Sequence, residues 1–97
     1  MLTVIETSAF QAQAAKIWSS MEVHDFIGWI AMNPEAGDVI PGTDGARKVR
    51  WGIKGRGKSG GARVIYVNLI DDGVIVLLTL YAKNVRENIP AREIKRL

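Results

Sequence analysis

The spacing of the apolar residues changes once along this chain, near residue 46, and this change limits the folds that the chain can form. Before residue 46 the apolar residues recur every three or four positions, which is typical of an α-helix. After it they alternate with polar residues, which is typical of a β-strand. Helices followed by an antiparallel meander predict an α+β fold. A chain of 97 residues rarely holds two cores, so we expect a single domain over residues 1–97.

The first half predicts a short strand and two helices. Residues 2–5 favour an edge strand that leads into Thr7 or Ser8 as a helix N-cap. Ser19 and Glu22 have the spacing of a capping box, which opens a second helix. Asn33-Pro34 ends it, because the residue before proline avoids helical dihedral angles. The first helix is expected to bury Phe10, Ala14, Ile17, Trp18 and Met21, and the second Val23, Phe26, Ile27 and Ile30. Residues 34–45 read as a loop, with a short strand at 38–40.

The second half predicts a sheet and a short C-terminal helix. In the first strand the apolar Val49, Trp51 and Ile53 fall on one face and Lys48, Arg50 and Lys54 on the other. A glycine-rich basic loop at 55–61 leads to a strand at 63–70. The sequence Asp71-Asp72-Gly73 predicts a tight turn into the apolar run 74–81, which suits a central strand. Residues 91–97 predict two turns of helix, closed by Ile94 and Leu97.

The charges are distributed very unevenly. Residues 1–46 carry one base and six acids, a net charge of −5, whereas residues 47–63 carry seven bases and no acid, a net charge of +7. The seven bases are Arg47, Lys48, Arg50, Lys54, Arg56, Lys58 and Arg63. Such a block generates a field that attracts a polyanion, which makes nucleic acid the leading class of partner. The alternative is a solvated basic loop without a ligand.

The residue types present disfavour several kinds of site. Without cysteine the chain has no thiolate nucleophile or sulfur ligand, and the composition suits the cytoplasm. The longest apolar run, 74–78, is too short for a bilayer, so we expect no membrane partner. The lone His24 has no second ligand nearby, and we expect a surface helix residue and neither a metal nor another cofactor. Strings at 52–59 and 55–60 match phosphate-loop patterns, but the strand that follows them offers no helix N-terminus for a phosphate.

Aromatic residues interleave with the cations, a combination found where RNA bases stack and basic side chains hold phosphates. Trp51 falls on the apolar face of its strand and is expected in the core. Tyr81 shares a face with Lys83 and is the better stacking candidate, although a core tyrosine is an equally good reading. The candidate RNA-binding residues are Arg47, Lys54, Arg56, Lys58 and Tyr81.

Four segments together resemble the RelE/HigB toxins of bacterial toxin–antitoxin modules. They are Gly37-Asp38-Val39-Ile40-Pro41-Gly42-Thr43, Arg47-Lys48-Val49-Arg50-Trp51, Gly57-Lys58-Ser59-Gly60-Gly61-Ala62-Arg63-Val64-Ile65-Tyr66 and Leu78-Thr79-Leu80-Tyr81-Ala82-Lys83-Asn84. The resemblance covers residues 7–94 in order. It implies two N-terminal helices packed on a twisted antiparallel sheet. It also implies a ribosome-dependent endoribonuclease that cuts mRNA, and a cognate antitoxin with a helix-turn-helix domain, such as HigA.

By position, the resemblance carries the catalytic role to Lys48, Arg50, Arg63 and Lys83. RNA cleavage without metal requires an activated 2′-OH, a stabilised phosphorane and a neutralised 5′-oxygen. Neighbouring cations favour the neutral form of Lys48, which is the candidate general base. Arg50 and Arg63 would hold the phosphate, because guanidinium groups match its oxygens. Lys83 would assist on the leaving side.

Two other functions remain open at this point. Many relatives carry consecutive tyrosines where this chain has Tyr66-Val67-Asn68. This difference favours a non-catalytic toxin like ParE, which poisons gyrase on the same scaffold. The other alternative is a basic RNA-binding module without toxicity.

Overall fold

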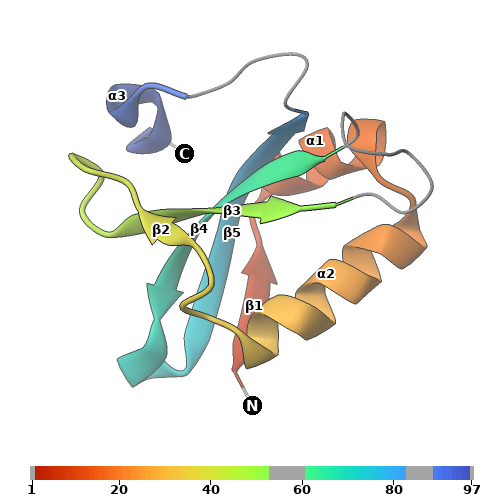
Figure 1. Cartoon of the computed structure of the whole chain (residues 1–97), viewed down its shortest axis with the longest axis horizontal. Coiled ribbons are helices and arrows are strands. Elements are labelled where there is room, and N and C mark those ends of the chain that lie inside the picture. Colours follow the sequence, from red (N-terminus) through yellow and green to blue (C-terminus); the bar gives the residue numbers. More distant parts are fainter. Residues whose placement is uncertain (1, 53–60, 83–88, 97) are drawn as a thin grey trace.

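The computed structural model describes residues 2–52, 61–82 and 89–96, which form a five-stranded sheet with helices on both faces (Figure 1). The elements in chain order are β1 (Thr3–Glu6), α1 (Ser8–Ile17), α2 (Ser20–Met32), β2 (Asp38–Val39), β3 (Ala46–Trp51), β4 (Ala62–Leu69), the 3₁₀ turn η2 (Ile70–Asp72), β5 (Val74–Ala82) and α3 (Ala91–Ile94). This arrangement confirms the predicted α+β fold. Among the described residues, the helices are all too short to span a bilayer.

The strands lie in the order β1-β5-β4-β3-β2. The three long strands β3, β4 and β5 pair as the predicted antiparallel meander, and η2 with Gly73 in the left-handed region (φ +71°) turns β4 into β5. The apolar run that forms β5 is an inner strand, as predicted, but its outer neighbour is β1. β1 pairs with it in parallel, so that Thr3 lies opposite Val74, and the sheet is mixed rather than wholly antiparallel.

The two N-terminal helices begin where the capping signals predict. The Thr7 side chain accepts a hydrogen bond from the Phe10 N–H, and Ser19 and Glu22 form both hydrogen bonds of a capping box. The capping box also explains one wrong expectation. Because α1 ends at Ile17 and α2 starts at Ser20, Met21 lies in the first turn of the second helix and is 67% exposed.

The sheet separates two apolar clusters. The larger lies under α1 and α2 and consists of Phe10, Ala14, Trp18, Phe26, Ile30, Val49, Ala62, Val64, Tyr66, Ile75, Leu77 and Leu80. Trp51 packs at its edge, with its ring centroid 4.9 Å from that of Trp29, which confirms the predicted apolar face of β3. On the opposite face, α3 brings Ile94 onto Ala46, Ile65 and Tyr81. His24 is exposed on α2, as predicted.

The loop between α2 and β2 is held against the sheet by one tyrosine. The Tyr66 hydroxyl accepts a hydrogen bond from the Gly37 N–H and donates one to the Pro34 carbonyl, both at 2.9 Å. Arg47 Nη1 donates to the Gly37 carbonyl at 2.7 Å. Gly37 has no room for a side chain, because a Cβ there would lie 2.8 Å from the Lys48 carbonyl oxygen. The loop is therefore fastened to the inner strands β3 and β4.

Candidate nucleic-acid interface

The sheet register brings basic side chains from two strands together. Arg50 of β3 lies directly opposite Arg63 of β4, and Arg63 lies opposite Tyr81 of β5. Directly paired residues point to the same face of a sheet. Lys48 stands two positions before Arg50 on the same strand and therefore shares this face. Three of the four cations to which the resemblance carries the catalytic role, Lys48, Arg50 and Arg63, thus lie on the face away from α1 and α2, which we call the cation face.

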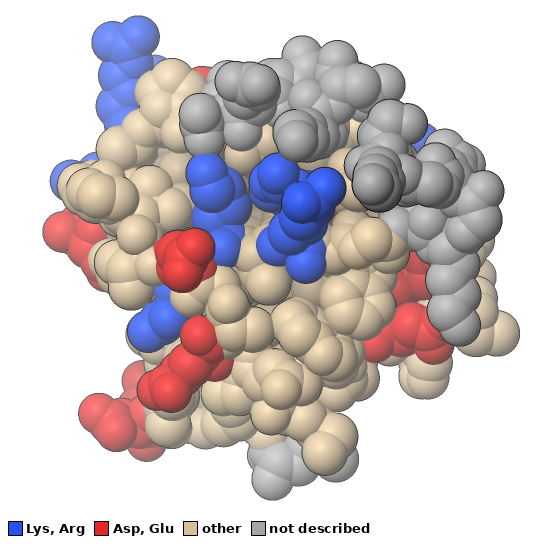
Figure 2. Space-filling view, viewed as in Figure 1, with Lys and Arg blue, Asp and Glu red and all other residues tan. Residues whose placement is uncertain are grey.

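The space-filling view shows where these cations lie on the surface. Lysine and arginine side chains gather near the middle of this view, and an acidic side chain borders them on one side (Figure 2). Asp38 of β2 lies directly opposite Lys48 in the register and shares its face. Arg50 is exposed, whereas Lys48 and Arg63 are half-buried. Like charges opposite each other on neighbouring strands repel, so the Arg50–Arg63 pair costs stability unless an anion lies between them.

One atom of this group lacks a hydrogen-bond partner. Arg63 Nη1 is shielded from solvent and has no hydrogen-bond partner among the described residues. A buried donor without a partner costs about 1–3 kcal/mol, and native structures rarely tolerate one without a reason. Neither Arg50 nor Arg63 forms an ion pair with a carboxylate in the described part of the chain. Neither guanidinium group is therefore neutralised by a carboxylate of the described residues, and a phosphate is the anion that best matches the guanidinium geometry.

Gly61, at the end of the glycine-rich loop, lies in contact distance of one of these groups. A Cβ at this glycine would lie 3.6 Å from Arg50 Nε. Gly61 is itself buried and directly precedes β4. Its only signal in the sequence is its place at the end of the glycine-rich loop. Proximity to a cation on another strand depends on the register, which the sequence pattern does not specify.

Two candidate RNA-binding residues lie away from the exposed surface of the cation face. Tyr81 is only 5% exposed and packs with Ile65 and Ile94. It is therefore a core residue, and its ring is not exposed for stacking with an RNA base. Arg47 points to the opposite face from Lys48 and donates hydrogen bonds to backbone carbonyls of the α2–β2 loop. Because side chains alternate along β3, Arg47 lies on the opposite face from Lys48 despite their adjacency in the sequence.

Four further predicted site residues lie outside the described residues. They are Lys54, Arg56 and Lys58 of the glycine-rich loop and the catalytic candidate Lys83. Ile53, Leu97 and most of the two phosphate-loop strings lie outside them as well. Their assignments stay predictions.

Comparison with solved structures identifies the fold as that of the RelE toxin. The Escherichia coli toxin RelE, in a free-state mutant with two arginines changed to alanine, superposes with a TM-score of 0.65. The alignment covers 98% of this chain and 94% of the RelE chain at 12% sequence identity. A copper-bound point mutant of a Helicobacter pylori toxin gives a TM-score of 0.46 at 17% identity, over 88% of this chain and 98% of that chain. No protein-family profile matches the sequence.

Proposed function

We propose that this protein is the toxin of a toxin–antitoxin module and that it cleaves mRNA on the ribosome. The observation that carries the proposal is the cross-strand pair Arg50–Arg63, with Lys48 beside it, on one face of a RelE-like sheet. The buried Arg63 Nη1 lacks an acceptor, and a phosphate oxygen is the acceptor that suits a guanidinium group best.

The chemistry follows from what a metal-independent cleavage requires. Lys48 removes the proton of the ribose 2′-OH, whose oxygen then attacks the adjacent phosphorus. Arg50 and Arg63 bind the non-bridging oxygens and stabilise the charge that develops on them. The bond from phosphorus to the 5′-oxygen breaks, and Lys83 donates a proton to the leaving oxygen. The products are a 2′,3′-cyclic phosphate and a 5′-hydroxyl end.

Dependence on the ribosome follows from the composition of this group. Three cationic side chains can bind any phosphate group of an RNA, but they do not select one conformation of the ribose. A ribosome that presents the message in a fixed conformation supplies the orientation that in-line attack needs. The same exposed charge would bind RNA indiscriminately, so the cell needs an antitoxin. We propose a helix-turn-helix antitoxin for this role.

The test is expression without an antitoxin, with mRNA cleavage mapped by primer extension. The unchanged chain should arrest translation and produce cuts that require ribosomes. Arg63→Ala should lower the cleavage rate about 10²–10³-fold, the range found when one donor to a developing anion is removed. Lys16→Ala removes an equal charge from an exposed position on α1 and should cleave normally.

Two results would contradict this proposal. If Arg63→Ala cleaved as fast as Lys16→Ala, the cation face would not be the active site. If growth stopped while mRNA stayed intact and DNA supercoiling changed, the chain would be a gyrase inhibitor on the same scaffold.

A further inference from the structure

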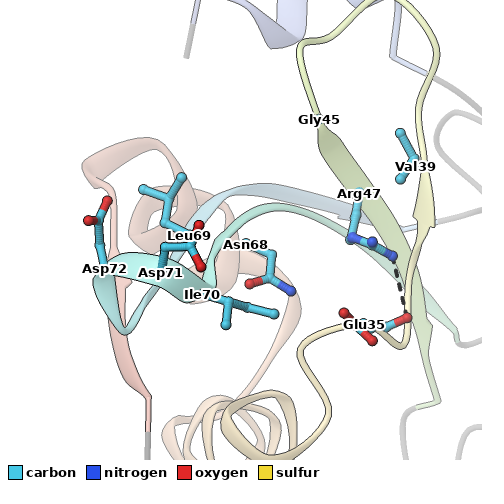
Figure 3. A pocket seen from close by; sticks show the side chains of 9 residues that line it. All are labelled: Glu35, Val39, Gly45, Arg47, Asn68, Leu69, Ile70, Asp71 and Asp72. Atoms are coloured by element: carbon cyan, nitrogen blue, oxygen red, sulfur yellow. Dashed lines mark hydrogen bonds between the residues drawn. The ribbon is translucent and has the colours of Figure 1, made fainter.

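A second surface feature lies at the end of the sheet where β4 continues beyond its pairing with β3. A cleft of about 400 Å³ opens where the α2–β2 loop, the β2–β3 pair and the corner between β4 and η2 meet (Figure 3). It is lined by Glu35, Val39, Gly45, Arg47, Asn68, Leu69, Ile70, Asp71 and Asp72. Arg47, which lines it, points to the opposite face from Lys48. Leu69, which also lines it, lies six residues along β4 from Arg63, a distance of about 20 Å, so a ligand in this cleft leaves Arg63 open.

The apolar part of this cleft is unusually exposed. Val39, Leu69 and Ile70 are 55%, 41% and 46% exposed, and they account for half of the large apolar side chains that the described chain leaves exposed. The others, on β1 and α2, do not line it. Exposed apolar side chains gathered in one concave patch with a polar rim mark a site where a protein docks.

The polar part of the cleft holds one hydrogen-bond acceptor without a donor. Asn68 Nδ2 donates to the Pro34 carbonyl at 2.8 Å, which orients the amide group. Its Oδ1 is shielded from solvent and accepts no hydrogen bond from the described residues. Such an acceptor is as costly as the unpaired donor of Arg63, and a bound N–H group would relieve it.

The charges around the cleft favour a positively charged ligand. Glu35, Asp71 and Asp72 line it, against the single cation Arg47. Arg47 Nη1 is already engaged by the carbonyls of Glu35, at 3.4 Å, and Gly37 (Figure 3). The carboxylates repel a phosphate backbone, so ribosomal and messenger RNA are poor ligands here. Lysine or arginine side chains fit, because they bring both positive charge and N–H donors.

We propose that this cleft docks a basic segment of the cognate antitoxin, in which an apolar side chain lies between lysines or arginines. The inference rests on the proposed toxin function, which supplies a protein partner. The apolar side chain packs on Leu69 and Ile70, and its basic neighbours reach the carboxylates. This segment anchors the antitoxin in the cleft. A different part of the antitoxin would have to cover Lys48, Arg50 and Arg63 in order to block them.

The test uses three synthetic probes, titrated into the ¹⁵N-labelled chain and followed by NMR. The basic peptide acetyl-Lys-Ile-Arg-Leu-Lys-Val-Arg-amide should shift the amide signals of Val39, Asn68 and Ile70. The same peptide with serine at its three apolar positions should bind about tenfold more weakly, because it lacks the apolar anchor. An acidic version with glutamate at the basic positions should not bind.

Variants of the chain distinguish binding of the basic peptide in the cleft from its general attraction to the acidic first half of the chain. Ile70→Ser and Asp72→Lys should each weaken the basic peptide about tenfold. Met21→Ser and Asp25→Lys make the same changes at exposed positions of α2 and should leave binding within about twofold. Unchanged amide signals outside the cleft show that the variants fold.

Docking of the antitoxin is tested with the protein encoded by the gene next to this one, whose affinity for the chain and its variants is measured. Ile70→Ser should weaken its complex with the chain, and Met21→Ser should not. The inference is overturned if the basic peptide shifts signals elsewhere, if the acidic peptide binds equally well, or if Ile70→Ser leaves both complexes unchanged. These outcomes do not depend on RNA cleavage. A chain that docks the peptide but leaves growth and mRNA intact would refute the proposed function alone.

Discussion

The substitution Tyr66→Phe removes one oxygen atom from the buried part of the molecule and keeps the ring. The lost hydroxyl accepts from the Gly37 N–H and donates to the Pro34 carbonyl, both at 2.9 Å. The Pro34 carbonyl keeps a second donor, because Asn68 Nδ2 lies 2.8 Å from it. Gly37 is buried, and its N–H has no other hydrogen bond among the described residues. The variant therefore orphans one buried donor.

An orphaned buried N–H costs about 1–3 kcal/mol, and the ring itself loses no apolar contact. We therefore expect Tyr66→Phe to lower the free energy of unfolding by about 2 kcal/mol. For a domain of this size that corresponds to a fall in Tm of about 8–16 °C. Urea unfolding followed by tryptophan fluorescence measures the change, since three tryptophans report on the helix side of the sheet.

The pH dependence gives a second and independent readout. Burial raises the pKa of Tyr66 above its ordinary value of 10.0, against smaller opposing effects of the Gly37 hydrogen bond and the Arg47 charge. The folded state therefore keeps its phenol proton at a pH where the unfolded chain has begun to lose it. This contribution to stability is complete below pH 10 and is lost as the pH rises through the folded-state pKa. The stability gap between wild type and Tyr66→Phe should narrow above pH 10.

Two results would refute this reasoning. A loss below about 0.5 kcal/mol at neutral pH would mean that water satisfies the Gly37 N–H, so that the tyrosine does not fasten the loop. A gap that stayed constant up to pH 11 would show that the phenol titrates at the same pH in both states.

Three further substitutions test the caps, the close packing and the cation face. Ser19→Ala should cost about 1 kcal/mol in urea unfolding because it breaks the capping box, whereas Ser20→Ala one position later should cost a few tenths at most. Gly37→Ala should cost about 1–3 kcal/mol, because its Cβ would lie 2.8 Å from the Lys48 carbonyl oxygen; an unchanged Tm would mean that the loop yields easily. Arg63→Met should raise the free energy of unfolding by about 1 kcal/mol, since it removes an unpaired donor and a like charge, and it should lower cleavage by the same factor of about 10²–10³ as Arg63→Ala. A less stable variant would mean that the Arg63 side chain has hydrogen-bond partners in the folded protein.

Local signals in the sequence predict the elements of this fold well. The Thr7 cap, the Ser19 capping box and Asn33-Pro34 each act within one helical turn, so the residues alone determine the helix ends. The alternation in β3 likewise places Val49 toward the helices and Lys48 and Arg50 away from them. Met21 was misplaced because its spacing fits the first helix, although the capping box starts a new one.

Non-local pairing is what the sequence pattern does not predict. The parallel pairing of β1 with β5 joins Thr3 to Val74, some seventy residues apart, and no short motif records it. The same holds for Tyr81. The alternation of side chains along β5 correctly places Tyr81 on the cation face. Its burial, however, depends on α3, which brings Ile94 over it. Arg47 was grouped with its neighbours by charge, and its hydrogen bond to the Gly37 carbonyl depends on the course of a distant loop.

Three buried side-chain atoms of the described residues lack a hydrogen-bond partner: Trp18 Nε1 in the core under the helices, and one atom each at the candidate catalytic face and in the cleft. Arg63 Nη1 lacks an acceptor on one side of the sheet, and Asn68 Oδ1, five residues later on the same strand, lacks a donor. A chain selected for stability alone would replace both, because each costs about 1–3 kcal/mol. A bound phosphate would satisfy the first and a bound basic segment the second, so each ligand restores stability that the free protein gives up. An antitoxin that occupies the cleft and also covers Arg63 with a carboxylate would gain from both, which would make the complex more stable than either partner alone.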